Sequence, residues 1–267
     1  MEVLVLEGLN TRTSVQVDAG PVLSSDEVPG SFARVVWLVP SDGRVPFINP
    51  EEKEMLAHAL AQQARRPSGL LGRLFGLGMG RINRGVNDFV LTQLDIRPNH
   101  KVLEIGFGPG KAIQQVEQRL TTGRVDGIDL SGTMVAQAAK LNRRAIEQGK
   151  VDLRVGEASR MPYRDQTFDR IFCVNVMYFW PQPERELAEM FRVMGEGGQV
   201  AIYIGDREQM AGVPMTKTGV FQLFSGQDVV GLLLDAGFQD CRIVETSIDQ
   251  GPISRGSCVL GVRPRGM

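Results

Sequence analysis

Three glycines and two carboxylates around a predicted strand end are the residues in this sequence with the clearest chemical potential. The run 102–110 (VLEIGFGPG) is typical of a buried strand that enters a glycine turn and then opens a helix. Gly106, Gly108 and Gly110 allow the backbone to turn tightly and to approach a ligand closely, beside the positive end of that helix. The motif therefore predicts a site for a nucleotide-like molecule.

The acidic residues near this turn indicate which part of a nucleotide is bound. The spacing is G-x-G-x-G with Pro109 inside it, whereas a dinucleotide pyrophosphate site has G-x-G-x-x-G. Glu104 precedes the turn, and a carboxylate there disfavours pyrophosphate and favours a cationic group. The next predicted strand ends at Asp129, where a carboxylate can accept hydrogen bonds from both hydroxyls of a ribose. The pattern indicates adenosine without phosphate, although Asp129 could instead cap the helix that begins at Ser131.

The elements that must position these residues follow a regular alternation. From Arg81 onward, short apolar strands alternate with amphipathic helices, which is the pattern of right-handed βαβ crossovers and a largely parallel sheet covered on both faces. A short loop between the last two strands cannot form a parallel crossover, so these two should pair antiparallel. The predicted strands lie near 101–106, 124–129, 151–155, 169–175, 199–204, 241–246 and 257–262, with a helix near 226–236 before the last two.

The N-terminal part has a different character. Residues 1–48 contain β-branched runs at 15–17 and 35–39 between turn signals, which indicate strands or an extended wrap. A helix is predicted over 49–66, because Asn49 can cap it, Pro50 suits its first position and Glu52 completes a capping box. The glycine-dense stretch 69–80 is either a linker or a mobile apolar lid. We therefore expect an N-terminal extension over 1–80 and an α/β domain over 81–267, which carries the glycine turn.

Four motifs in this order resemble the class I S-adenosylmethionine-dependent methyltransferases. They are E-x-G-x-G-x-G at 104–110, G-I-D-L-S at 127–131, G-E-A with M-P-Y at 156–163, and F-D-R-I-F-C-V-N at 168–175. The resemblance runs from about Arg81 to the C-terminus and is nearest to the small-molecule group that includes the ubiquinone and menaquinone C-methyltransferases. It implies an α/β fold with a Rossmann-like doubly wound, mostly parallel seven-stranded sheet, an antiparallel C-terminal strand, and S-adenosylmethionine as the cofactor.

The resemblance also implies roles for individual residues. Glu104 and the loop with Gly106, Gly108 and Gly110 would meet the amino-acid half of the cofactor. Asp129 would hold the ribose and Leu130 would lie against the adenine, whose edge Glu157 and Ala158 would contact. Asn175 would lie beside the sulfonium. Two of these residues have plainer alternatives, because Glu157 could be a solvated loop charge and Asn175 could bond to backbone at a strand end.

The segment 175–180 (NVMYFW) follows the fourth predicted strand, where the acceptor must approach. Methyltransferases that act on amino groups of nucleic-acid bases or of protein glutamine have Asn/Asp-Pro-Pro-Tyr here, and both prolines are missing. Aromatic and methionine residues suit a small apolar or aromatic acceptor, methylated at oxygen, nitrogen or carbon. The predicted substrate residues are Met177, Tyr178, Trp180 and Phe221, although some of them can be ordinary core.

Methyl transfer from a sulfonium requires a base only if the acceptor must lose a proton, because the donor is already activated. Of the two histidines, His58 lies on the N-terminal helix, and His100 precedes the first strand of the domain, at the end opposite the expected crevice. The remaining candidates are Tyr178, Tyr203, Asp206 and Glu208. No set of metal-binding residues stands out, so no metal is expected.

Composition limits the partners and the compartment. Thirty Lys and Arg against 31 Asp and Glu give a net charge of −1, which argues against a long nucleic acid as substrate. Three cysteines without a C-x-x-C pair favour a reducing, cytoplasmic compartment. No apolar run is long enough for a signal peptide or a membrane span. Homo-oligomerisation stays open.

Two other functions share part of this evidence. A nicotinamide-dependent oxidoreductase also has a strand, a glycine turn and a ribose-binding acid, but the glycine spacing, Glu104 and the antiparallel terminus speak against it. A non-catalytic protein that binds S-adenosylmethionine would keep the same binding motifs, and the first 80 residues would then be an interaction module.

Overall fold

The computed structural model describes residues 2–4, 37–39, 49–248 and 253–266. The expectation for 15–17 lies outside these ranges. The chain divides into two units, Met1–Lys53 and Glu54–Met267. In the first unit, β1 (Glu2–Leu4) pairs antiparallel with β2 (Trp37–Val39), which lies within the β-branched run 35–39. The second unit contains the whole of the predicted alternating region.

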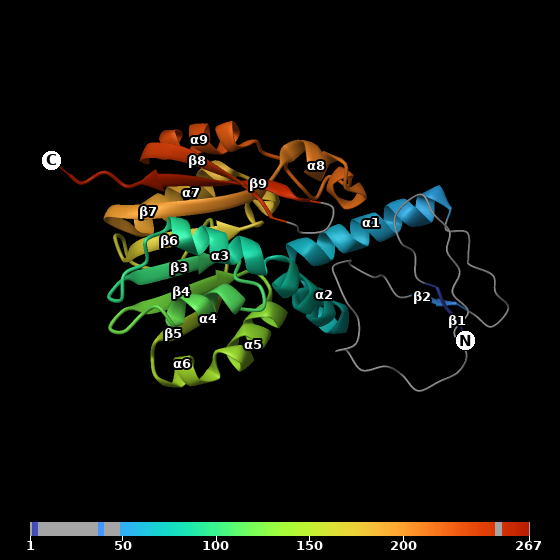
Figure 1. Ribbon diagram of the computed structural model, residues 1–267, viewed down its shortest axis with the longest axis horizontal. Helices are drawn as coiled ribbons and strands as arrows, with labels where there is room; N and C mark the ends of the chain where they lie inside the picture. The colour runs from blue at the N-terminus through green and yellow to red at the C-terminus, as the bar shows by residue number, and fades with distance from the viewer. Residues whose placement is uncertain (1, 5–36, 40–48, 249–252, 267) are drawn as a thin grey trace. The chain divides into compact units, whose positions relative to one another are not determined.

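A seven-stranded sheet organises the second unit, with the strand order β5-β4-β3-β6-β7-β9-β8 (Figure 1). β9 is antiparallel to both of its neighbours, and the other neighbouring pairs are parallel. The predicted Rossmann-like α/β fold with an antiparallel C-terminal strand is confirmed. The strands are β3 (Lys101–Ile105), β4 (Arg124–Asp129), β5 (Val151–Val155), β6 (Phe168–Val174), β7 (Met194–Gly205), β8 (Gln239–Ser247) and β9 (Arg255–Val262).

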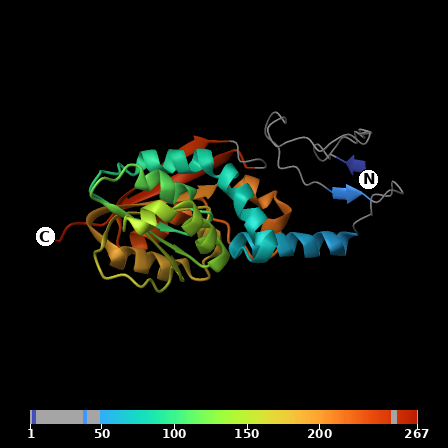
Figure 2. The ribbon, with the colours of Figure 1, turned by 90° about the horizontal axis from the view of Figure 1, so that it is seen from below.

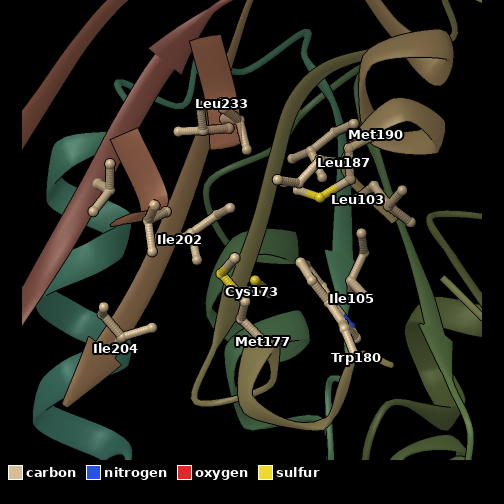
Figure 3. Packing of buried hydrophobic residues seen from close by; sticks show 14 of the residues in the cluster. Leu103, Ile105, Cys173, Met177, Trp180, Leu187, Met190, Ile202, Ile204 and Leu233 are labelled. Atoms are coloured by element: carbon tan, nitrogen blue, oxygen red, sulfur yellow. The ribbon is translucent and has the colours of Figure 1, made fainter. Parts of the chain in front are cut away.

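Helices cover both faces of this sheet because successive strand residues point to opposite sides. Val102 packs in a cluster with α3 (Arg84–Gln93), α4 (Lys111–Glu117) and α5 (Gly132–Leu141). Leu103 packs in another cluster with α7 (Pro183–Val193) and α9 (Gly226–Asp235), shown in Figure 3. Shorter helices are α6 (Arg143–Glu147), η1 (Met177–Phe179), α8 (Arg207–Ala211) and η2 (Pro214–Lys217). Among the described residues, no helix combines the length and apolar content needed to cross a bilayer.

The predicted capping signal begins α1 (Pro50–Arg65). The backbone N–H of Glu52 donates to Asn49 Oδ1 at 2.8 Å, and the N–H of Asn49 donates to Glu52 Oε2 at 2.9 Å. This reciprocal pair satisfies two backbone donors that a helix start would otherwise leave without partners.

The glycine-dense stretch forms a helix, α2 (Gly69–Ile82), rather than an irregular linker. Its glycines permit close packing: a Cβ at Gly72 would lie 2.6 Å from the carbonyl carbon of Pro67, and one at Gly76 would lie 2.7 Å from Met134 Cε on α5. α2 therefore belongs to the same unit as the sheet, whereas the sequence placed the boundary near residue 80. Figures 1 and 2 show α2 beyond one end of the sheet. Whether it moves as a lid stays a hypothesis.

Candidate functional site

A cavity of about 260 Å³ lies at the carboxyl ends of β3, β4, β5 and β6, where the loops after these strands meet residues of α2 and α3. β3 and β6 are neighbours in the sheet, and the chain adds strands outward on either side of them. Such a reversal of strand order opens a crevice at the carboxyl edge of an α/β sheet. The strand-end segments that line the cavity are 104–109, 128–130, 156–159 and 174–176.

The glycine turn follows β3 and forms one wall of the cavity. Gly106 has φ 68° and Gly110 has φ 79°, a left-handed region that favours glycine. A Cβ at Gly106 would collide with the side chain of Val176, and one at Gly110 would lie 2.6 Å from Ala138 Cβ. Gly106 and Gly108 line the cavity, whereas Gly110 lies behind the lining and forms the start of α4. The turn thus requires glycine for backbone geometry as well as for ligand access.

Asp129 ends β4 and lines the cavity with 8% of its surface exposed. Its Oδ1 accepts the backbone N–H of Ser131 at 2.8 Å, and its Oδ2 accepts that of Gly108 at 2.9 Å. Burial raises the pKa of this carboxyl to about 6, against the opposing effect of the two N–H donors. Ser131, rather than Asp129, is the N-cap of α5. Each Asp129 oxygen keeps a lone pair for a further donor.

Glu104 lies on β3, with 4% of its surface exposed to the cavity. Among the described residues, its Oε2 has no hydrogen-bond partner. Burial raises the pKa of Glu104 well above its ordinary value, the charge of Asp129 raises it further, and a hydrogen bond from the Ile113 backbone opposes both effects. A buried carboxylate without a counter-charge is costly, so this wall of the cavity favours a ligand with a cationic, hydrogen-bond-donating group.

A third carboxylate, Glu186, was not found from the sequence. It lies in the first turn of α7, lines the cavity with 4% of its surface exposed, and its Oε2 also has no partner among the described residues. Burial raises its pKa, and the nearby charge of Glu157 adds to this effect. Glu157 itself lines the cavity but is exposed to solvent. Acidic residues are common in a first helical turn, so the sequence carried no signal for an inward orientation.

Asn175 follows β6 and lines the cavity in a left-handed conformation with φ 57°. Its Nδ2 donates to Asn83 Oδ1 at 3.1 Å, and its Oδ1 accepts the hydroxyl of Tyr178 at 3.2 Å. These bonds connect the end of β6 with the start of α3. Asn83 and Asn87, both beside the cavity, were not found from the sequence because α3 is read there only as an amphipathic helix.

Of the four predicted substrate residues, one lines the cavity and three do not. Trp180 lines the cavity together with Val176 and Phe179. Phe221 lies outside the lining, with its ring 4.7 Å from that of Phe179, and Met177 is fully buried in the core. Tyr178 is also outside the lining. Hydrophobic residue types alone cannot distinguish a cavity wall from the layer behind it.

The predicted base candidates lie away from the cavity lining. The Tyr178 hydroxyl accepts the N–H of Gly205 and donates to Asn175, and burial raises its pKa above the ordinary value. Tyr203 is fully buried on β7. Asp206 caps α8, accepting the N–H of Gln209 at 3.0 Å, and pairs with an arginine. The fourth candidate, Glu208, is also absent from the lining, as are the two histidines that the sequence disfavoured as bases, His58 and His100.

The remaining predicted cofactor residues are on the cavity wall. Leu130 follows Asp129, and Ala158 lies in the loop after β5, so both face the space between the ends of β4 and β5. The structure therefore brings together all the predicted cofactor residues except Gly110. Phe75 and Met79 of α2 also line the cavity, which adds a contribution from the N-terminal region that the strand motifs could not predict.

Comparison with known proteins gives consistent matches across this region. A family model described as a methyltransferase domain matches residues 103–202, which include the glycine turn, Asp129 and Asn175. The uncharacterized methyltransferase YdaC of Bacillus subtilis (strain 168) is 29% identical over 63% of this chain and 87% of its own length. Phosphatidylethanolamine N-methyltransferase of Cereibacter sphaeroides is 34% identical over 48% of this chain and 62% of its own.

Solved structures show the same fold. An S-adenosylmethionine-dependent methyltransferase from Aquifex aeolicus superposes with a TM-score of 0.55 at 24% sequence identity, covering 65% of this chain and 88% of that one.

Proposed function

We propose that this chain methylates a small apolar or aromatic acceptor at oxygen, nitrogen or carbon, on the premise that its methyltransferase domain makes it a class I S-adenosylmethionine-dependent methyltransferase. The observation that carries the proposal is the Glu104 carboxylate oxygen, which has no partner within the described part of the chain and lies one strand away from the Asp129 carboxylate in the same cavity. S-adenosylmethionine, the cofactor, has an ammonium group, a ribose diol and no phosphate, and these groups suit such a pair.

The side chains fit this cofactor from one end to the other. Glu104 would accept hydrogen bonds from the ammonium group, and Asp129 would accept them from the ribose hydroxyls. Leu130 and Ala158 would pack against the adenine, and the unpartnered Glu186 carboxylate would accept a hydrogen bond from the adenine amino group, beside Glu157. Arg65 and Lys111 also line the cavity, but a pyrophosphate there would lie beside the buried carboxylates of Glu104, Asp129 and Glu186, so the nicotinamide alternative is disfavoured.

When bound, the cofactor supplies a methyl group on a positively charged sulfur that is already activated for in-line displacement. The protein then has to position the acceptor and exclude water. Asn175 is held between Asn83 and Tyr178, so it would present a fixed amide at the end of β6. Phe179 and Trp180 would form the apolar wall against which an acceptor packs. We expect no histidine base, because neither His58 nor His100 lines the cavity.

The acceptor class rests on the walls of the cavity. Phe75, Val176, Phe179 and Trp180 contribute apolar side chains to its lining. The phosphatidylethanolamine N-methyltransferase of Cereibacter sphaeroides, by its name, acts on an amine attached to apolar chains. This relative supports an acceptor with a substantial apolar part.

A labelling experiment tests the proposal. Purified protein would be incubated with methyl-labelled S-adenosylmethionine and separate pools of phenols, quinols and lipid amines, and the extracted products analysed by mass spectrometry. We expect labelled product from at least one pool. Asp129→Ala should weaken cofactor binding by about 1–3 kcal/mol through lost ribose hydrogen bonds. Asp235→Ala, an exposed control on α9, should behave as wild type. Tight cofactor binding without transfer to any apolar pool would contradict the acceptor class.

A further inference from the structure

The outer side of α2 carries a leucine face made of Leu70, Leu71, Leu74 and Leu77. These four side chains are 62–77% exposed. Residues 70, 74 and 77 recur at helical spacing and form one stripe. Isolated exposed leucines are ordinary on a protein surface, but a contiguous row on one short helix indicates a contact surface.

The opposite side of the same helix belongs to the cavity. Gly72 and Gly76 pack α2 closely against the loop at Pro67 and against α5, while Phe75 and Met79 line the cavity. The leucine face is therefore the outer surface of a cavity wall. Its leucines are absent from the cavity lining, so the packing of the fold does not account for them.

The charge of this region is distinctive. Residues 55–87 contain five arginines and no Asp or Glu, in a chain whose net charge is −1. All five arginines are exposed. The end of α1 and the whole of α2 thus combine exposed apolar side chains with unopposed positive charge. The arginines are Arg65, Arg66, Arg73, Arg81 and Arg84.

We propose that the leucine face of α2 docks on the surface of an anionic lipid bilayer, with the leucines in the acyl boundary and the neighbouring arginines at the headgroups. Apolar insertion and attraction to anionic lipid add in such helices. The charge argues against a second copy of this chain on the same face, because two arginine-rich surfaces would repel each other. It also argues against a nucleic acid, which would pair with the arginines but leave the leucines in water.

If the proposed function holds, docking would also affect how the acceptor reaches the cavity. Because α2 separates the leucine face from the cavity, docking would bring the cavity beside the bilayer, from which an apolar acceptor can enter. The association would be peripheral, as no described helix is suited to span the membrane. Vesicle binding itself needs neither cofactor nor acceptor.

Sedimentation of the full chain with lipid vesicles tests this proposal. The protein would be mixed with vesicles of phosphatidylcholine alone and with vesicles containing equal parts of phosphatidylcholine and phosphatidylglycerol. We expect binding to the anionic vesicles that falls severalfold as salt rises from about 0.05 M to about 0.5 M, and weak binding to the neutral ones. Leu70→Gln/Leu74→Gln/Leu77→Gln should lower the partition coefficient by roughly tenfold or more.

Two controls make the result specific. Leu234→Gln removes a leucine that is 52% exposed on α9, and it should leave vesicle binding unchanged. Arg73→Gln/Arg81→Gln tests the charge without touching the leucines, and therefore decides the question even if the leucine variant does not fold. It should weaken binding to anionic vesicles by roughly tenfold.

The outcomes separate this proposal from the enzymatic one. Absence of vesicle binding by a chain that binds S-adenosylhomocysteine would overturn the membrane proposal alone. A concentration-dependent dimer that the leucine substitutions abolish would also overturn it. The same holds if the leucine face binds only RNA, or if residues 1–48 cover it. Vesicle binding by a chain without affinity for S-adenosylhomocysteine would instead contradict the proposed function.

Discussion

The burial of the Glu104 carboxyl lowers the stability of the folded protein, and we propose that binding of a cationic ligand offsets this cost. Its carboxyl is almost fully buried, lacks a partner for Oε2 among the described residues, and has a pKa well above the ordinary value. A raised carboxyl pKa means that the folded state holds the proton more tightly than the unfolded state does. This contribution therefore lowers stability as pH rises above the unfolded pKa. A cationic ligand would offset that cost on binding.

Glu104→Gln should separate these two effects. The amide keeps the shape but loses the charge, so affinity for S-adenosylhomocysteine should fall by about tenfold to a hundredfold. The melting temperature of the protein without ligand should rise relative to wild type, and by more at about pH 8 than at about pH 5. Calorimetry and thermal unfolding would measure both, with exposed Glu147→Gln as the control. If the affinity for S-adenosylhomocysteine is unchanged, Glu104 does not contact the cofactor.

Glu186 gives a second test at the residue level. A side chain that recognises adenine should distinguish its amino group from the carbonyl group that inosine has at the same position. Wild type should prefer S-adenosylhomocysteine over its inosine analogue by about tenfold or more, since the carboxylate accepts from an amino group and is repelled by a carbonyl oxygen. Glu186→Gln can donate to that oxygen, so its preference should shrink toward one. Competition binding would measure the ratios. Glu157→Gln should retain the wild-type preference for S-adenosylhomocysteine. If Glu157→Gln loses this preference and Glu186→Gln keeps it, then Glu157, and not Glu186, binds the adenine amino group.

The residues found from the sequence share a local signal. Glu104 and Asp129 adjoin predicted strand ends, and parallel strands carry such residues to one edge of the sheet. Glu186 has no comparable signal, because only the packing of α7 decides which residue of its first turn faces the cavity. Met177 and Phe221 illustrate the reverse case, since apolar side chains beside a site are equally suited to the core behind it.

At the level of elements, α2 shows how packing can override propensity. Five glycines in Gly69–Ile82 disfavour a helix in isolation, and for that reason the sequence indicated a linker or lid. Close approach to Pro67 and α5 explains two of them. The strands were predictable because alternation and turn residues are local, whereas the packing of α2 against α5 brings Gly76 beside Met134, more than fifty positions away.

A pair of alanine substitutions on α2 tests this explanation. Gly72→Ala would place a Cβ against the backbone of Pro67, and it should destabilise the fold by about 1–3 kcal/mol. Gly78→Ala meets no atom within 4 Å and should stabilise the helix by about 0.5–1 kcal/mol. Denaturant unfolding would measure both. Equal effects of the same sign would show that glycine packing does not hold α2 in place.

At the level of the whole molecule, a net charge near zero conceals a separation of charge. Carboxylates of Glu104, Asp129 and Glu186 line the cavity together with Arg65 and Lys111, while the charged residues of 55–87 are all arginines. The overall balance disfavours a protein whose whole surface is cationic, but it cannot reveal a local cluster of arginines. Composition therefore limits the class of partner, whereas the fold shows where on the molecule the charged side chains lie.

Calorimetric titration of the purified chain with S-adenosylhomocysteine and, separately, with NAD tests the central claim most directly. The account predicts saturable one-to-one binding of S-adenosylhomocysteine at micromolar or tighter affinity, weakened in Asp129→Ala, and no measurable binding of NAD. Tight binding of NAD with no response to S-adenosylhomocysteine would show that the carboxylate-lined cavity holds a pyrophosphate after all, and the assignment of cofactor and reaction would be wrong.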